Sequence, residues 1–221
     1  MRTGDLASLP EDASFPRRLW VGLRAFRRLL RDVTDPVHGA MFQESLDGGR
    51  YARFARELRA SPDGRAFLSR RSSLALEHLD LARMAALPAE TLGAEVARFY
   101  GEPRLNFPSP QRTLTDAQYL AYRMRQSHDL HHMLTGYGTD SVGEHELQAF
   151  QFGNLRTPTS LVTLVFAVHK RYSVPRRTYF RRLWRAYRRG RASPPIVAMA
   201  WEELWEAPLA TVRERYCAPR G

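Results

Sequence analysis

Two histidines near the end of one predicted helix are spaced to share a metal ion. His128 and His132 are four residues apart, so both imidazoles lie on one helical face, one turn from each other. The same face continues backward through Met124, Ala121 and Ala117, so the imidazoles are expected to point inward. Neutral imidazole nitrogens bind zinc, iron or manganese, and a carboxylate commonly completes such a site.

Two carboxylates are candidates to complete the site. Eleven residues separate Glu144 from His132, and the glycines among them allow a helical hairpin that returns Glu144 to the histidines. Asp129 lies about 100° around the helix from His128, so it either coordinates the metal or orients a ligand. We rank Glu144 above Asp129. His131 points to a different face and is expected at the rim or surface.

Each of these residues also has an ordinary structural explanation. A histidine pair at this spacing is often a polar helix end. Glu144 comes three residues after Ser141, which is the spacing of a capping box and needs no metal.

The elements around this motif are predicted to be helices, because apolar spacings of three and four recur and only one isoleucine, Ile196, is present. We expect an all-α fold with the metal site between two consecutive helices. Residues 1–16 are predicted to be a disordered N-terminus, and residues 17–221 one compact helical domain. The predicted helices, besides a stripe from Leu19 to Val33, cover residues 51–59, 74–86, 89–100, 116–135, 141–152, 159–172, 176–189, 194–206 and 209–217. Residues 61–64 are predicted to form a turn that leads to a short helix ending at Arg70. Residues 101–110 are expected to be irregular.

The net charge of +11 is concentrated in two segments. Six arginines lie in residues 17–31 and ten basic residues in 170–191, neither segment contains an acid, and the rest of the chain therefore carries 11 − 16 = −5. Both segments have an apolar side, which is typical of amphipathic helices that bind an anionic membrane surface. Core packing with a solvated basic face explains the pattern equally well. No recognition motif supports nucleic-acid binding, so we expect no nucleic-acid partner.

The single cysteine, Cys217, excludes an internal disulfide and a thiolate metal cluster, which fits a reducing compartment. No apolar stretch approaches the roughly 20 residues that span a bilayer. The N-terminus lacks the apolar core of a signal peptide. We expect an intracellular protein of bacterial origin, located on the cytoplasmic side of the membrane as a peripheral protein.

Three ordered motifs resemble the coenzyme Q (ubiquinone) biosynthesis protein four family. They are HDLHH with a glutamate after eleven further residues (His128 to Glu144), PDGRAFLSRR (Pro62 to Arg71) and LPAETLGAEVARFY (Leu87 to Tyr100). The resemblance runs from about Met41 to the C-terminus. Ser72 stands where the family usually has proline.

The resemblance implies an all-helical fold with His128, Asp129, His132 and Glu144 as metal ligands and catalytic residues, usually with zinc. It implies C1 decarboxylation of a polyprenylated hydroxybenzoate, with replacement by hydroxyl proposed, and organisation of a biosynthetic complex on the membrane. The implied partners are this prenylated aromatic substrate and other ubiquinone-biosynthesis enzymes, and a homodimer is a candidate assembly. Two other hypotheses remain: a lipid-binding scaffold with a structural metal, and a zincin-like metallohydrolase in which Asp129 activates water.

Overall fold

The computed structural model describes residues 9, 13–29, 31, 36–101, 114–167 and 174–219. Within these ranges the ordered backbone is helical, and the only β pairing is an isolated bridge between Thr91 and Pro208. The prediction of an all-α fold is confirmed. None of the described helices is both long and apolar enough to cross a bilayer.

The described residues form eleven α-helices and three short 3-10 turns. The α-helices are α1 (Phe15–Leu29), α2 (Pro36–Arg59), α3 (Pro62–Arg70), α4 (Leu81–Ala85), α5 (Leu92–Phe99), α6 (Asp116–Gln126), α7 (His128–Thr135), α8 (Ser141–Leu155), α9 (Pro158–Ala167), α10 (Arg176–Ala192) and α11 (Leu209–Tyr216). The 3-10 turns are η1 (Leu76–His78), η2 (Ile196–Ala198) and η3 (Trp201–Glu203).

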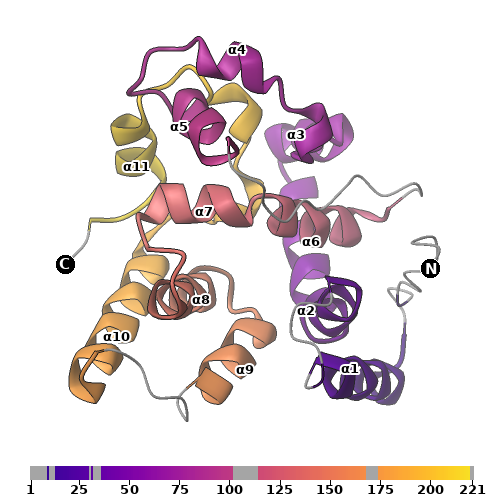
Figure 1. The fold of residues 1–221 in the computed structure, drawn as a ribbon. Helices are drawn as coiled ribbons and strands as arrows, with labels where there is room; N and C mark the ends of the chain where they lie inside the picture. The colour runs from indigo at the N-terminus through magenta and orange to yellow at the C-terminus, as the bar shows by residue number, and fades with distance from the viewer. Residues whose placement is uncertain are drawn as a thin grey trace.

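The short helix α7 lies across the middle of the molecule (Figure 1). Helices α3, α4, α5 and α11 lie above it in this view, and α1, α8, α9 and α10 lie below it. The core runs through both groups and includes Leu120, Leu134, Leu147, Phe150 and Trp201, all at most 1% exposed. Helix α7 is therefore packed from both sides, which holds its side chains in place.

Two glycines allow α8 and α10 to approach backbone to backbone. A Cβ atom added at Gly190 would lie 2.0 Å from the carbonyl oxygen of Phe150, and one added at Gly153 would lie 2.2 Å from that of Tyr187. Any larger residue would push the helices apart. The close crossing fixes the position of α8, which carries Glu144.

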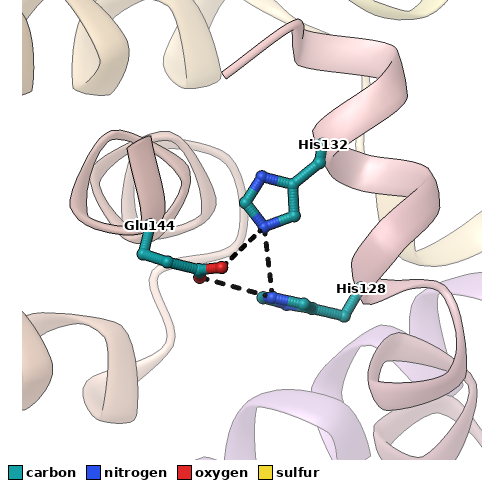
Figure 2. A group of neighbouring side chains, drawn as sticks. All are labelled: His128, His132 and Glu144. Atoms are coloured by element: carbon teal, nitrogen blue, oxygen red, sulfur yellow. Dashed lines mark hydrogen bonds and ion pairs between the residues drawn. The ribbon is translucent and has the colours of Figure 1, made fainter. Parts of the chain in front are cut away.

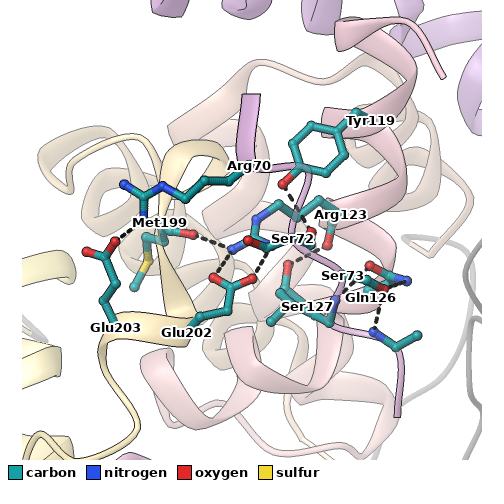
Figure 3. Close-up of polar contacts among 12 residues, drawn as sticks. Arg70, Ser72, Ser73, Tyr119, Arg123, Gln126, Ser127, Met199, Glu202 and Glu203 are labelled. Atoms are coloured by element: carbon teal, nitrogen blue, oxygen red, sulfur yellow. Dashed lines mark hydrogen bonds and ion pairs between the residues drawn. The ribbon is translucent and has the colours of Figure 1, made fainter. Parts of the chain in front are cut away.

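A buried arginine joins α6 to two segments that are distant in sequence (Figure 3). Arg123 is 2% exposed and donates to both carboxylate oxygens of Glu202 at 2.7 Å. It also donates to the carbonyl oxygens of Ser72 at 3.1 Å and Met199 at 2.9 Å. Because α7 begins five residues later, these bonds also fix where α7 starts.

The predicted continuous helix over residues 116–135 is wrong, because the chain breaks at Ser127 into α6 and α7. Ser127 has φ −90° and ψ 8°, and its hydroxyl donates to the carbonyl oxygen of Arg123 at 2.9 Å. A serine side chain that bonds the preceding turn competes with the regular helical pattern. The N-terminal half of the prediction is confirmed in detail, since Thr115 and Gln118 form the expected capping box.

The predicted turn at residues 61–64 is wrong after Ser61, because the Ser61 side chain caps α3 and the helix begins at Pro62. Two other predicted helices are wrong for local reasons. Residues 74–86 form η1 and then α4, because the Asp80 side chain accepts from the backbone of Arg83 and starts a new helix there. Residues 194–206 form η2 and η3 with no α-helix, and Pro194 and Pro195 at the start of this segment have no N–H to donate.

Helix α2 is much longer than the predicted residues 51–59, because it begins at Pro36 and continues through Gly48 and Gly49. Gly48 lies against the guanidinium of Arg18 on α1, where a Cβ atom would be 2.6 Å from Nη1. Tertiary packing therefore explains a glycine inside this helix.

Several predictions fall outside the described residues. These are most of the disordered N-terminus, most of the irregular segment 101–110, the end of the first stripe at Leu30 and Val33, and residues 168–172 of the predicted helix 159–172.

Candidate metal centre

Two imidazoles from α7 and one carboxylate from α8 point toward one another (Figure 2). The Nε2 atoms of His128 and His132 are 3.3 Å apart. One oxygen of Glu144 lies 3.1 Å from His132 Nε2 and the other lies 3.4 Å from His128 Nε2. The predicted hairpin that returns Glu144 to the histidines is present in the structure.

His132 is oriented by a backbone carbonyl. It is 4% exposed, and its Nδ1 lies 3.2 Å from the carbonyl oxygen of Tyr137. A carbonyl oxygen only accepts, so Nδ1 carries the hydrogen and donates it. In the neutral ring this leaves the lone pair on Nε2, the atom that faces Glu144, as a histidine ligand requires.

The turn between α7 and α8 brings Glu144 close to the histidines. Gly136 ends α7 with φ 68°, a left-handed conformation that favours glycine. Gly143 packs against the carbonyl oxygen of Gly138, where an added Cβ atom would be only 2.1 Å away. Asp140 caps α8 by accepting from the backbone of residues 142 and 143 at 2.8 Å. The capping-box explanation for Glu144 is therefore wrong, because the cap of α8 is Asp140 and not Ser141.

The three side chains are electrostatically coupled. Burial would raise the pKa of Glu144, but hydrogen bonds and charge from His128 and His132 outweigh it and lower that pKa from 4.5 to about 2. Burial would lower the pKa of His132, but the carboxylate of Glu144, the carbonyl of Tyr137 and the charge of Asp129 raise it. A carboxylate that stays ionised beside two imidazoles favours a bound cation.

The spacing of the three ligand atoms fits a first-row metal ion. Metal–ligand bonds of 2.0–2.1 Å place tetrahedral ligand atoms about 3.3 Å apart, and neighbouring octahedral ones about 3.0 Å apart. The observed separations of 3.3, 3.1 and 3.4 Å suit both geometries. The donor set of two nitrogens and a carboxylate is one that zinc, iron and manganese accept.

The other two predicted residues of the motif behave differently. Asp129 is half-buried on α7 and does not join the group formed by the two histidines and Glu144, although its charge acts on His132. His131 was expected at the surface, and this is wrong, because it is fully buried. Its ring nitrogens lie 3.2 Å from Ser127 Oγ and 3.3 Å from Gln151 Nε2.

The buried position of His131 follows from the packing of α7 on two sides. Its ring lies 5.8 Å from that of Trp201, between centroids. Burial, with the nearby His128 and His132, lowers its pKa well below 6.5, so it is a neutral structural residue at neutral pH. Sequence spacing relative to His128 could not reveal this second packed face.

Arginines from the C-terminal helices hold the last turn of α7. Arg189 on α10 donates to the carbonyl oxygen of Thr135 at 2.7 Å, and Arg213 on α11 donates to that of Met133 at 2.8 and 3.0 Å. Both bonds satisfy carbonyl groups at a helix C-terminus, where a cation is also favoured. From the sequence, Arg189 was counted only in the basic segment 170–191 and Arg213 was given no role, because nothing in their spacing indicates the contact with α7.

Comparison with known proteins shows which family the chain belongs to. Residues 30–218 match the family described as "Coenzyme Q (ubiquinone) biosynthesis protein Coq4". The chain belongs to this family. The two other motifs that resemble the family have structural roles. Thr91 of LPAETLG caps α5, and Gly64 of PDGRAFLSRR packs against the backbone of Leu58. Ser72, at the usual proline position, follows the end of α3, and its carbonyl oxygen accepts from Arg123.

Similar proteins come from animals, fungi and bacteria. The chain is 28% identical over 164 residues to the mitochondrial ubiquinone biosynthesis protein COQ4 homolog of Rattus norvegicus, covering 72% of this chain and 62% of that protein. It is 28% identical over 195 residues to the mitochondrial coq4 protein of Pyrenophora tritici-repentis, covering 82% and 65%. The chain thus spans less than two thirds of these relatives.

A crystal structure of a protein from Nostoc punctiforme PCC 73102, assigned to ubiquinone biosynthesis, has a similar fold. The TM-score is 0.70 at 28% identity, with 90% of this chain and 97% of that chain covered.

Proposed function

We propose that this protein is a metal-dependent lyase of ubiquinone biosynthesis that removes the ring carboxyl at C1 of a polyprenylated hydroxybenzoate. The proposed ligand and catalytic residues are His128, Asp129, His132 and Glu144. The observation that carries the proposal is the convergence of two imidazole nitrogens and a carboxylate, in a chain of the Coq4 family. The His128 and Glu144 side chains are 34% and 37% exposed, so a substrate can approach from their side.

Zinc is the proposed metal, with iron or manganese as alternatives, and it would supply a Lewis-acidic charge to the substrate carboxylate or phenolate. His132 keeps Nε2 directed at the site through its bond to Tyr137. Glu144, with a pKa of about 2, stays ionised at neutral pH. Loss of carbon dioxide leaves a ring carbon that must take up a proton. We assign Asp129 either to the ligand set or to holding this proton.

Replacement of the carboxyl group by hydroxyl is an oxidation, so it needs an electron acceptor in addition to a Lewis-acidic metal. Zinc has no redox chemistry, so the coupled reaction requires iron, manganese or a separate electron acceptor.

The prenyl tail sets the proposed location. A substrate of this kind resides in a bilayer, so we propose a peripheral protein on the cytoplasmic side of an anionic bacterial membrane. Other ubiquinone-biosynthesis enzymes are the proposed partners, and a homodimer is the proposed assembly.

A second candidate function is a non-catalytic lipid-binding scaffold with a structural metal. The position of the ligands on two helices favours it, because an ion shared by α7 and α8 would join them.

Metal analysis tests the site. The wild-type protein should hold one metal ion per chain, and His128→Ala and Glu144→Ala should hold much less. His78→Ala removes an exposed histidine on η1 and is the control, so it should match wild type. Equal metal content in all four proteins would show that the assignment is wrong.

Turnover separates the two candidate functions. Purified protein is given a prenylated hydroxybenzoate labelled at the carboxyl carbon, and release of labelled carbon dioxide is measured. Release that disappears in His132→Ala supports the lyase. Metal binding without release, in the presence of electron acceptors, supports the scaffold, and peptide cleavage would favour a zincin-like hydrolase.

A further inference from the structure

The large apolar side chains that are exposed gather on three helices. Among the described residues these lie on α1, α9 and α10 and on no other element. We name them the docking face: Leu19, Trp20, Leu23, Leu161, Val165, Phe166, Phe180 and Trp184, with exposed fractions from 40% to 60%. All three helices lie along the lower edge in Figure 1, at the end opposite α4, α5 and α11. An apolar surface gathered at one end of a protein marks an interaction site.

The three helices form one connected structure. The ring of Phe26 on α1 lies 5.0 Å from that of Phe166 on α9, between centroids. Helices α9 and α10 both pack on α8. Helix α9 has no charged residue in its ten positions, yet Leu161 and Val165 on one side of it are about half exposed. It is therefore an apolar element between two basic ones.

The basic helices carry charge of one sign only. Neither α1 nor α10 contains an acidic residue. Exposed arginines include Arg24 and Arg28 on α1 and Arg177, Arg181 and Arg185 on α10. In a two-fold dimer the same face meets itself, so this surface would bring arginines against arginines. Charge complementarity therefore favours an anionic occupant over a second copy of the chain.

We infer that α1, α9 and the first half of α10 dock on the surface of an anionic lipid bilayer, with the uncharged helix α9 entering the headgroup region. An interfacial surface of this kind needs an apolar side, a basic side and aromatic anchors. Trp20 and Trp184, each 60% exposed, lie on α1 and α10 and supply the anchors. This inference deepens the proposed function, because it says how a bilayer-borne substrate and the metal centre are brought together.

The cation and the aromatic ring are paired on both basic helices. The guanidinium of Arg24 lies 5.4 Å from the ring of Trp20, and that of Arg176 lies 5.6 Å from the ring of Phe180. Such a pair presents apolar and positive surface together, which matches the border between acyl chains and anionic headgroups. An acidic protein would match the charge but would leave the apolar helix α9 without a matching surface.

Vesicle flotation tests the inference with the full chain and no substrate. Vesicles of phosphatidylcholine with phosphatidylglycerol are compared with vesicles of phosphatidylcholine alone. Wild type should float with the anionic vesicles, and more salt should release it. Leu161→Ser/Val165→Ser, which changes the exposed side of α9, should bind at least tenfold more weakly.

A charge-matched pair of variants separates the docking face from general basicity. Arg24→Gln/Arg28→Gln/Arg181→Gln should weaken anionic-vesicle binding at least tenfold, because each arginine near the surface contributes about fivefold. The control removes the same charge at the opposite end of the molecule and should bind like wild type: Arg83→Gln/Arg98→Gln/Arg215→Gln.

Fluorescence and mass measurements complete the test. The emission of Trp20 and Trp184 should shift to shorter wavelength when anionic vesicles are added. Failure of wild type to bind, or equal weakening by both triple variants, would overturn the inference. The inference would also be overturned if light scattering showed a wild-type dimer that Leu161→Ser/Val165→Ser converts to a monomer. The docking face would then join two copies of the chain. Metal content is read in every variant and should stay at the wild-type level, so a failed docking face and a failed metal centre are told apart.

Discussion

Two neighbouring glutamates, Glu202 and Glu203, give a direct test of how the fold positions α7, the helix that carries His128 and His132. Glu202 pairs with Arg123, and the Arg123 side chain is 3% exposed (Figure 3). Glu203 pairs with Arg70, and the side chains of Glu203 and Arg70 are each more than half exposed. We predict that Arg123→Met strongly destabilises the protein and that Arg70→Met does not. The two substitutions remove the same charge from the same region.

The magnitude follows from what Arg123→Met leaves behind. Glu202 loses two hydrogen bonds of 2.7 Å, and the carbonyls of Ser72 and Met199 lose one donor each. Removing one partner of a buried ion pair costs about 3–5 kcal/mol. The Glu202 side chain is 30% exposed and can regain some water, so we expect the lower end, about 3 kcal/mol. For a chain of this size that corresponds to a Tm lower by about 6–12 °C.

Urea unfolding followed by circular dichroism measures the effect, with calorimetry for Tm. Arg70→Met should leave the urea midpoint at the wild-type value, since exposed ion pairs contribute little. An Arg123→Met variant within about 1 kcal/mol of wild type would refute the reasoning, because the buried pair would then not hold α6 in place.

Three further predictions concern α7 and the start of α8. Gly143→Ala should lower metal affinity, measured by equilibrium dialysis, at least tenfold, because the new methyl group meets the backbone carbonyl of Gly138. Gly49→Ala is the control and should leave the affinity unchanged, because a Cβ atom at that position has open space. His131→Phe should cost about 1–3 kcal/mol in urea unfolding, because Ser127 Oγ and Gln151 Nε2 each lose a buried hydrogen-bond partner, while metal content should stay unchanged. For metal-free protein, the depressed pKa of Glu144 stabilises the fold above pH 4.5, and this contribution is lost between pH 4.5 and about 2; Glu144→Gln should remove that part of the pH profile.

The candidate site was more predictable than the helices that carry it. The four-residue spacing of His128 and His132 and the glycines before Glu144 were enough to predict three converging ligand atoms. Such spacing is a local property of one helix and one turn. The break at Ser127 and the burial of His131 depend on what packs against α7 from elsewhere in the chain, and a helical periodicity has no information about that.

The amphipathic segments show the same limit. Sequence patterns identified the basic helices α1 and α10 but left open whether their apolar sides belonged to the core. The structure divides them: Ala25 and Leu183 are buried, while Trp20 and Trp184 remain exposed. It also adds α9, whose uncharged and mainly apolar sequence is typical of a buried helix and gave no signal of exposure.

The arginines that cap α7 have a consequence for the order in which the protein is made. During synthesis, the two histidines and Glu144 leave the ribosome well before Arg189 and Arg213, which hold the last turn of α7. The ligand atoms therefore exist on the nascent chain before the contacts that fix their helix. If the centre holds the proposed metal, stable loading is therefore expected only after α10 and α11 have been translated and have folded back onto the centre.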